Sequence, residues 1–483
     1  MLSVSAAAQE AGDRLAVVDG ETRLTYAEFS RLVLQLAVKI NRTCPNSAQP
    51  VAFVAYPVLD SLTLLCALLE LGRPALPLNP RLLPIDHQVL VEQAHAVEVA
   101  FDSETLTVKR DAGPGLFPAD WRTPAILIAT SGATGRPKLV RLSERALIAA
   151  ADASAERLLW MEHDRWLLSL SLCHIGGLSI ATRCMLARAP VVMCNPRGGP
   201  AEIVKIIHDS QVTMLSLVST QLHRILAGDH ELRGSKLRIV LMGAMHADPW
   251  LVGAARIQKI PVLTTYGMAE TASQVATQLR TDLKSLIGPC HDVGPPLSKL
   301  EVKIVEEEIV VRGDVLFDGY TSPVIAGSSQ SGPVSVHGPA STGPLLRDGW
   351  FHTGDWGRID KRGRLTVLGR ASDRITTSGE TVVPAEVERV LELLPSIERA
   401  CVFGVPDAMR GESVAAAIIL RQGYGFDPVH FQNQIIGQLA AFKLPVAIAE
   451  VSEFVMTATG KLDRRLTARA CSARLQVLAP RST

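Results

Sequence analysis

The chain has 483 residues, of which 47% are hydrophobic and 20% charged, and its formal net charge is +1. That length exceeds one typical domain, and that composition is typical of a globular protein. The near-zero charge argues against binding to nucleic acid or to an acidic membrane surface, and no apolar stretch is long enough to span a membrane.

The N-terminal residues and the cysteines indicate the cellular compartment in which the protein is expected. Residues 1–6 lack the basic region and apolar core of a signal peptide. The eight cysteines are scattered and include no Cys-x-x-Cys pair, which argues against a zinc site or a disulfide scaffold. We therefore expect a cytoplasmic protein in which the cysteines are small buried side chains.

The first three quarters of the chain alternate between helical and strand patterns. Thr25-Tyr26-Ala27-Glu28 is a capping box before a predicted helix over 29–38, and a strand over 51–55 precedes a helix over 62–71. A further helix is expected over 201–210, and further strands are expected over 125–129, 190–194, 213–218, 237–242 and 261–265. Apolar strands separated by helices indicate an α/β fold with mostly parallel sheets covered on both faces.

The pattern changes from Glu301 onward to short alternating strands, over 301–305, 308–312 and 364–368. Residues 321–343 are rich in Ser, Gly and Pro and are expected to form a mobile loop. After Arg370 comes a block the size of a small domain. It contains predicted helices over 384–394 and 428–441 and strands over 399–405 and 414–420. We therefore expect a large domain over 1–370 and a small domain over 371–483.

Residues 125–138 form the most informative stretch of the sequence. The apolar run Ala125 to Ala129 predicts a buried strand, and Thr130-Ser131-Gly132-Ala133-Thr134-Gly135-Arg136-Pro137-Lys138 follows it directly. Glycines allow a backbone to turn tightly around an anion, while hydroxyls and a lysine add donors and positive charge. The run is not a Walker P-loop, because Leu139 stands where that pattern needs Ser or Thr. It is either a phosphate-binding loop or an ordinary solvated loop.

A second run, residues 264–271, places Tyr266, Gly267, Met268 and Glu270 after a short strand. Open α/β sheets bind their ligands at the carboxyl ends of strands. The tyrosine ring could stack on a purine, and the carboxylate of Glu270 could hold a metal. The alternative is a helix N-terminus with an acidic side chain near its dipole.

Three later runs complete the set. In residues 349–355 the carboxylate of Asp355 can accept two hydrogen bonds from a ribose diol, or it can form an Asx turn. Residues 369–375 contain Arg370 and lie at the expected domain boundary. Residues 457–465 contain Gly460-Lys461, for which a solvated lysine is the alternative.

In this order and spacing, the five runs resemble the adenylate-forming superfamily, which comprises acyl-CoA synthetases, firefly luciferases and the adenylation domains of peptide synthetases. The resemblance covers nearly the whole chain, with further matches at 24–28, 308–313, 317–320, 404–407 and 411–412. It implies a large N-terminal domain with mostly parallel sheets plus a distorted β-barrel subdomain. It also implies a small, mobile α+β C-terminal domain.

The resemblance implies a two-step reaction. A carboxylate attacks the α-phosphate of Mg-ATP, giving an acyl-adenylate and pyrophosphate, and the thiol of coenzyme A then displaces AMP. Such chemistry needs positioning and charge neutralisation more than covalent help. The implied partners are a small carboxylic acid, ATP with Mg²⁺ and coenzyme A, with no nucleic acid and no membrane span. The sequence leaves open whether the protein forms a homodimer.

Residue by residue, the resemblance assigns the ATP phosphates to Thr130, Ser131, Gly132, Thr134, Gly135 and Lys138. The adenine is assigned to Gly243, Ala244, Tyr266, Gly267 and Met268, and the ribose to Asp355 supported by Arg370. Glu270 is assigned to Mg²⁺. Lys461 would stabilise the negative charge that builds up in the transition state. Ser372 corresponds to the hinge about which the small domain rotates.

Two positions depart from the family pattern. Ala133 and Ala269 stand where the family usually has threonines that donate to phosphates. Losing one hydrogen bond to a charged acceptor costs about 1.5–3 kcal/mol if nothing replaces it. We expect a slower enzyme, or compensation by the neighbouring Thr134 and Thr271.

The acyl pocket is expected in the middle of the large domain. Residues 171–179 fit the family segment whose aromatic or histidine side chain gates this pocket, which assigns His174 to the acyl substrate and to catalysis. Arg183 follows in an otherwise apolar helix. A buried arginine is costly unless it is paired, so it meets either a substrate anion or a local acid.

His-x-Gly-Gly-Leu-Ser followed by a cation, Ala-Ser-Gln at 272–274 and a serine at the hinge resemble the o-succinylbenzoate–CoA ligases of menaquinone and phylloquinone synthesis. Their substrate has two carboxylates, and the resemblance implies that Arg183 binds the distal one. Ser219, Thr220 and Ser273 would line the same pocket.

Three other functions stay open. The nearest is a CoA ligase for another aryl or medium-chain acid. An amino-acid adenylating enzyme fits less well, since no acidic residue is evident to meet an α-amino group. A non-catalytic nucleotide-binding relative is suggested by Ala133 and Ala269.

Overall fold

The computed structural model describes residues 1–102, 104–113, 124–130, 138–194, 198–228, 232, 234–243, 249–284, 292–321, 346–457 and 462–478. The chain separates into two compact units. The first consists of Met1–Lys303, Val310–His352 and Ile359–Thr366, and the second of Ile304–Ile309, Thr353–Arg358 and Val367–Thr483. Within the described ranges, no helix is both long and apolar enough to cross a membrane.

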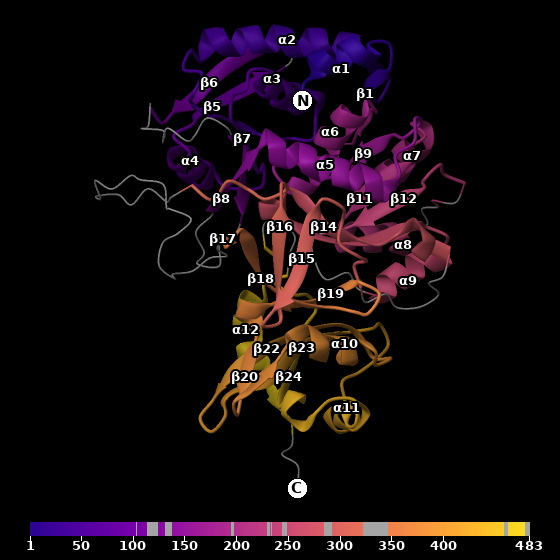
Figure 1. Cartoon of the computed structure of the whole chain (residues 1–483). Helices are drawn as coiled ribbons and strands as arrows, with labels where there is room; N and C mark the ends of the chain where they lie inside the picture. Colours follow the sequence, from indigo (N-terminus) through magenta and orange to yellow (C-terminus); the bar gives the residue numbers. More distant parts are fainter. Residues whose placement is uncertain are drawn as a thin grey trace. The chain divides into compact units, whose positions relative to one another are not determined.

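The larger sheet of the first unit has eight strands in the order β14–β13–β12–β11–β9–β10–β1–β2 (Figure 1). All neighbours are parallel except β13 with β14 and β1 with β2, which are antiparallel. The strands are β1 (Leu15–Asp19), β2 (Thr22–Thr25), β9 (Trp166–Leu168), β10 (Val191–Met193), β11 (Met214–Leu217), β12 (Ile239–Met242), β13 (Val262–Met268) and β14 (Ser273–Thr277).

The second sheet of this unit has the order β6–β5–β3–β4–β7–β8. Its four middle strands are parallel, and antiparallel hairpin partners β6 and β8 close its two edges. The strands are β3 (Val51–Val54), β4 (Ala75–Leu78), β5 (Val97–Asp102), β6 (Thr105–Asp111), β7 (Pro124–Thr130) and β8 (Lys138–Ser143). The mostly parallel α/β fold predicted from the sequence is confirmed.

One apolar core joins buried residues of both sheets, with Trp166 and Ile126 fully buried in it, and each sheet also contributes to a separate apolar cluster of its own. The capping box at Thr25 forms as predicted, with the Thr25 hydroxyl accepting from the Glu28 amide and the Glu28 carboxylate from the Thr25 amide. The helices of this unit are α1 (Val4–Ala11), α2 (Tyr26–Thr43), α3 (Leu59–Glu70), α4 (Pro84–Gln93), α5 (Glu144–Leu158), α6 (Ile175–Ala187), α7 (Gly199–Asp209), α8 (Ser219–Ala227) and α9 (Pro249–Ile257).

A third sheet has the order β15–β16–β18–β17, with β19 beside β18. Its strands are β15 (Leu300–Val305), β16 (Glu308–Gly313), β17 (Leu346–Arg347), β18 (Trp350–Ile359) and β19 (Leu365–Arg370). It supplies the short strands predicted after Glu301. The loop expected over 321–343 falls almost wholly on residues outside the described ranges.

The second unit has its own core around a sheet of order β21–β20–β23–β24–β25, in which β22 also pairs with β23. The elements are β20 (Ile375–Thr377), β21 (Glu380–Val382), β22 (Ile397–Asp407), β23 (Gly411–Leu420), β24 (Ala447–Glu450), β25 (Gln476–Val477), α10 (Pro384–Glu392), α11 (Pro428–Ile435) and α12 (Arg464–Cys471).

The helix predicted over 428–441 is too long. Helix α11 ends at Ile435, and Gly437 follows with φ +79, a left-handed conformation that ends a helix.

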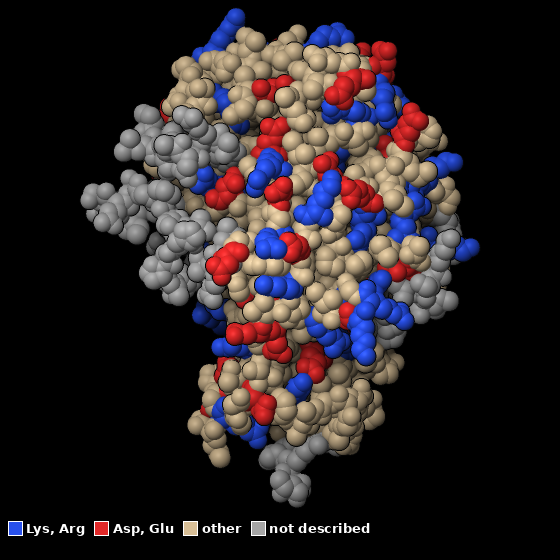
Figure 2. All heavy atoms as spheres, viewed as in Figure 1, with Lys and Arg blue, Asp and Glu red and all other residues tan. Residues whose placement is uncertain are grey.

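On the face shown in Figure 2, cationic and anionic side chains are interspersed, in keeping with the net charge of +1.

Candidate functional site

Thr130 and Lys138 face each other at the end of the β7–β8 hairpin where the chain passes from β7 to β8. They are paired across the two strands, and the Thr130 hydroxyl donates to the Lys138 carbonyl at 3.3 Å. The strand predicted before the glycine-rich run is confirmed as β7. The intervening Ser131, Gly132, Thr134 and Gly135 lie outside the described residues.

Strand β13 becomes accessible at its carboxyl end. Residues 262–264 are buried, whereas residues 265–268, which include Tyr266, are half-buried. Gly267 is required here because a Cβ would lie 1.6 Å from the Ser273 carbonyl oxygen of β14. Gly243 follows the neighbouring strand β12 directly, and a Cβ there would lie 3.0 Å from Cγ2 of Thr265. Ala244 lies outside the part of the chain that the structure describes.

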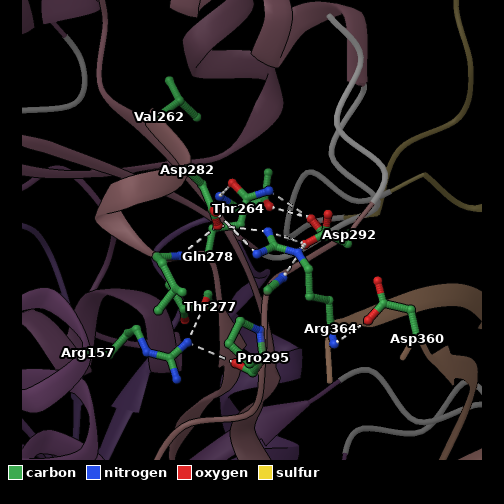
Figure 3. A network of polar contacts seen from close by, with 12 residues as sticks. Arg157, Val262, Thr264, Thr277, Gln278, Asp282, Asp292, Pro295, Asp360 and Arg364 are labelled. Carbon is green, nitrogen blue, oxygen red and sulfur yellow. Dashed lines mark hydrogen bonds and ion pairs between the residues drawn. The ribbon is translucent and has the colours of Figure 1, made fainter. Parts of the chain in front are cut away.

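A polar network holds the buried part of β13 in place (Figure 3). The Gln278 side chain accepts from the Thr264 amide at 3.1 Å and donates to the Asp292 carbonyl at 3.0 Å. Arg364 binds the carboxylates of both Asp282 and Asp292, at 2.7 Å each. These carboxylates raise the pKa of Arg364 despite its partial burial. The strand that carries Tyr266 therefore has a rigid support.

Glu270 and Lys138 both contact Tyr320. The Tyr320 hydroxyl donates to Oε1 of Glu270 at 2.9 Å, and Nζ of Lys138 lies 5.1 Å from the centre of the Tyr320 ring. The structure thus brings together two residues that were predicted to bind Mg²⁺ and phosphate.

A resident metal site is not built into the described part of the chain, where no three His, Cys, Asp or Glu side chains gather. Mg²⁺ that enters with ATP keeps several waters and needs only one or two carboxylates beside the phosphates. The half-buried carboxylate of Glu270 fits such an ion.

Arg183 is a buried cation on α6, with 3% of its surface exposed. Nη2 donates to the Ser273 hydroxyl at 2.9 Å, and the guanidinium lies 5.3 Å from the centre of a Trp166 ring. Its Nε is buried without a partner, and no carboxylate among the described residues pairs with it. Burial lowers the pKa of Arg183 to about 9 because the charged form is desolvated.

Ser273 reaches Arg183 through a strained turn. Ala272 and Ser273 have φ values of +48 and +124, which non-glycine residues rarely adopt. Such strain persists where the surrounding structure holds it, and it is concentrated at functional sites. The alternative that Arg183 pairs with a local acid finds no support in the described residues.

The other predicted acyl-pocket residues lie at helix starts. His174 is the N-cap of α6 and is half-buried. Ser219 and Thr220 begin α8, where the Ser219 hydroxyl is buried without a hydrogen bond and Thr220 is exposed.

In the second unit, Asp355 and Arg370 form an ion pair. Nε of Arg370 lies 2.9 Å from Oδ1 of Asp355, and Nη1 donates to the Thr353 carbonyl at 3.1 Å. Gly354 has φ +70, so this point of β18, directly before Asp355, needs glycine; the Thr-Gly turn expected from the sequence is a strand segment instead. Ser372 is exposed, and its hydroxyl contacts Asp373 at 3.2 Å. Lys461 lies outside the described residues.

The expectation that Thr271 compensates for Ala269 is wrong. Thr271 is fully buried, and its hydroxyl is engaged with Met268 and the Ser273 carbonyl inside the turn. It holds the turn between β13 and β14 and cannot reach a phosphate. The other candidate, Thr134, lies outside the described residues, as does Ala133.

Sequence reasoning did not assign a role to Tyr320 or Trp166. Tyr320 lies in the Phe317-Asp318-Gly319-Tyr320 match, which was the available signal. In the sequence, Trp166 resembles an ordinary core residue of a strand. Its ring contact with Arg183 depends on the packing of α6 over the sheet, which no local pattern predicts.

Comparison with known proteins agrees with this arrangement. The model of the AMP-binding enzyme family matches residues 4–321, and that of the AMP-binding enzyme C-terminal domain matches residues 386–461. The 2-succinylbenzoate–CoA ligase of Geobacillus kaustophilus is 32% identical over 480 residues, covering 94% of each chain.

Solved structures are similar over the same length. The o-succinylbenzoate CoA synthetase of Bacillus subtilis in complex with the acyl-adenylate intermediate OSB-AMP has a TM-score of 0.80 at 26% identity, covering 96% of both chains. Its complex with ATP and magnesium ion has a TM-score of 0.80 at 26% identity, covering 96% of this chain and 98% of that one. With a strand-end site of this composition and a family match over residues 4–321, the chain belongs to the AMP-binding enzymes.

Proposed function

We propose that this chain is an ATP-dependent acid–CoA ligase whose substrate is o-succinylbenzoate and whose product is o-succinylbenzoyl-CoA, in menaquinone or phylloquinone synthesis. The proposal is supported by the relatives of that name, which match over nearly their whole length. The scattered cysteines, seven of which are buried and free, fit a cytoplasmic enzyme.

The observation that carries the choice of acid is the buried Arg183. A desolvated guanidinium without an acidic partner is costly, and a substrate carboxylate would neutralise it. A buried cation of this kind favours an acid with two carboxylates, one to be activated and one to meet Arg183. A monocarboxylic acid would leave the charge unpaired.

The proposed reaction has two half-reactions. One carboxylate oxygen attacks the α-phosphorus of ATP and displaces pyrophosphate, with Thr130, Lys138 and the intervening loop holding the phosphates. Glu270 would hold Mg²⁺, which neutralises phosphate charge when bound. Asp355, oriented by Arg370, would bind the ribose hydroxyls, and Lys461 would stabilise the developing negative charge.

In the second half-reaction, the sulfur of coenzyme A attacks the acyl carbonyl carbon, the thiol proton is lost to solvent, and AMP leaves with the bonding electrons of the mixed anhydride. We assign Tyr266 to the adenine and His174 to the acyl group. The small domain, residues 371–483, would move about Ser372 relative to residues 1–370 between the two steps.

The proposal is tested by a panel of acids with ATP and coenzyme A, in which o-succinylbenzoate is compared with benzoate, which has no second carboxylate. Arg183→Gln should reduce kcat/KM for o-succinylbenzoate at least tenfold and change that for benzoate little. Arg188→Gln is the matched control, because Arg188 ends the same helix and pairs with the exposed Glu10. An equal loss on both acids would contradict the counter-ion role of Arg183, and ATP binding without turnover of any acid would contradict the ligase function.

A further inference from the structure

Residues 317–321, which we call the bridging segment, lie between the two elements that carry Lys138 and Glu270. On one side the segment pairs with β8: the Asp318 and Thr321 amides donate to the Arg141 and Leu139 carbonyls, and the Arg141 amide donates to Gly319. On the other side the Phe317 amide donates to the Glu270 carbonyl at 2.9 Å. Gly319 has φ +109, so the turn within the segment needs glycine.

Tyr320 is the side chain of this segment that reaches both residues. Its hydroxyl donates to Oε1 of Glu270 at 2.9 Å, and its ring lies 5.1 Å from Nζ of Lys138. Phe317 packs edge-on against the Tyr320 ring, with centroids 4.9 Å apart, and against Phe351 at 5.2 Å. Phe351 is fully buried, so the ring of Tyr320 rests on the core.

Two consequences follow for Glu270. A free glutamate side chain samples several rotamers, and a hydrogen bond to Oε1 from a ring anchored in the core restricts it to one. Because the hydroxyl engages Oε1, Oε2 is left to face an incoming ion. Carboxylates that ligate metals are usually held by such hydrogen bonds, and losing the partner typically weakens metal binding or activity 10- to 100-fold.

The ring acts on Lys138 by a different force. A lysine ammonium near an aromatic face is attracted by the ring quadrupole, and this attraction does not require the hydroxyl. The two contacts of Tyr320 can therefore be separated by mutation.

We propose that Tyr320 is a positioning residue for the first half-reaction: its hydroxyl orients Glu270 toward the metal of the ATP complex, and its ring places Lys138 toward the phosphates. This inference rests on the proposed function, since it needs ATP and a divalent cation as ligands. It couples the two contacts through one side chain, so ATP and its metal are bound as a unit.

The test uses the full-length protein and Mn²⁺ as the probe, with protein-bound Mn²⁺ measured by equilibrium dialysis against the same concentration of ATP on both sides, because ATP also chelates Mn²⁺ in solution. Tyr320→Phe removes the hydroxyl and keeps the ring, and it should raise the apparent Kd for Mn²⁺ about tenfold. Its metal-free binding of ATP should be unchanged. Thr321→Val is the matched control, because it removes the neighbouring hydroxyl, which accepts from the Gln93 side chain at 3.3 Å.

Tyr320→Leu removes the ring as well, and it should also weaken metal-free ATP binding about two- to fivefold. Circular dichroism and thermal melting of each variant check that it is folded. Wild-type-like Mn²⁺ binding by folded Tyr320→Phe would overturn the inference alone. A wild-type protein that binds no Mn²⁺ with ATP would overturn the proposed function and the inference with it.

Discussion

Gln278 holds Thr264 by both its main chain and its side chain. The Gln278 amide donates to the Thr264 carbonyl at 3.1 Å, and the Gln278 side-chain oxygen accepts from the Thr264 amide at 3.1 Å (Figure 3). Gln278 is fully buried, and its side-chain nitrogen donates to the Asp292 carbonyl. Tyr266 lies two residues beyond Thr264 in the same strand. The two hydrogen bonds from Gln278 therefore fix the position of the backbone that carries Tyr266, the residue proposed to contact the adenine.

Replacing Gln278 by methionine, which keeps the length and loses the polar group, should therefore affect nucleotide binding. The Thr264 amide would lose its partner and Arg256 one of its acceptors, at a cost of about 1–3 kcal/mol each, while the Asp292 carbonyl would keep its hydrogen bond from the Thr264 hydroxyl. We expect a lower melting temperature and a KM for ATP raised severalfold, with the KM for coenzyme A unchanged. Gln88→Met is the control, since Gln88 is a half-buried residue of α4 whose side-chain nitrogen donates to the Glu92 carboxylate at 2.7 Å. A lower melting temperature with an unchanged KM for ATP would limit Gln278 to a structural role.

Gly267→Ala should be far more damaging than an ordinary glycine substitution. Its Cβ would lie 1.6 Å from the Ser273 carbonyl oxygen, so β13 and β14 would have to separate at the proposed nucleotide site. Overpacking of this kind costs about 1–3 kcal/mol or more. Gly425→Ala is the control, because a Cβ there meets no atom within 4 Å. The measurement is urea unfolding of both variants together with ATP binding. Equal midpoints for the two would mean that the strands adjust without cost.

Local patterns in the sequence predicted much of the fold. The capping box at Thr25 and the apolar runs of β7 and β13 report on near neighbours, and all three form where expected. The end of α11 was missed because the helical pattern continues past Gly437, whose backbone conformation decides the boundary.

The site was predictable only in part, for the same reason. Glu270 and Lys138 could be named from their motifs, whereas their common partner Tyr320 is 50 residues from Glu270 in the chain. Its contact depends on the bridging segment joining the edge of β8, and no local pattern reports that pairing. The motif likewise suggested that the Thr271 hydroxyl could bind a phosphate, whereas in the structure this hydroxyl donates to the Ser273 carbonyl within the turn.

The cysteines supply a prediction about pH. Seven are buried and free, and burial raises the pKa of Cys173 to about 11 and of Cys194 and Cys401 to about 12. In a Cys290→Ser variant, which leaves only these seven, native protein at pH 8 should react slowly with a thiol reagent and quickly after unfolding. Rapid reaction of the native variant would contradict the burial.

The sign of the linked stability change follows from the same shift. A thiol whose pKa is higher in the folded than in the unfolded protein holds its proton more tightly when folded. Stability is therefore retained below the ordinary thiol pKa of about 8.5 and lost as the pH rises toward the folded values. Urea unfolding midpoints should fall between pH 8.5 and pH 11, and less so in variants with Cys194→Ala or Cys401→Ala.

The two half-reactions should separate when Lys461 is replaced by alanine. If Lys461 stabilises the charge that builds up as the carboxylate attacks ATP, its loss should slow pyrophosphate release about a hundred- to a thousandfold. The second half-reaction should survive, because by then the lysine has moved away with the small domain. Synthetic acyl-adenylate and coenzyme A should therefore still give thioester at close to the wild-type rate. Lys361→Ala, at an exposed position, should leave both steps intact. Loss of both half-reactions in folded Lys461→Ala protein would mean that one arrangement of the site performs both steps, and the rotation about Ser372 would have to be abandoned.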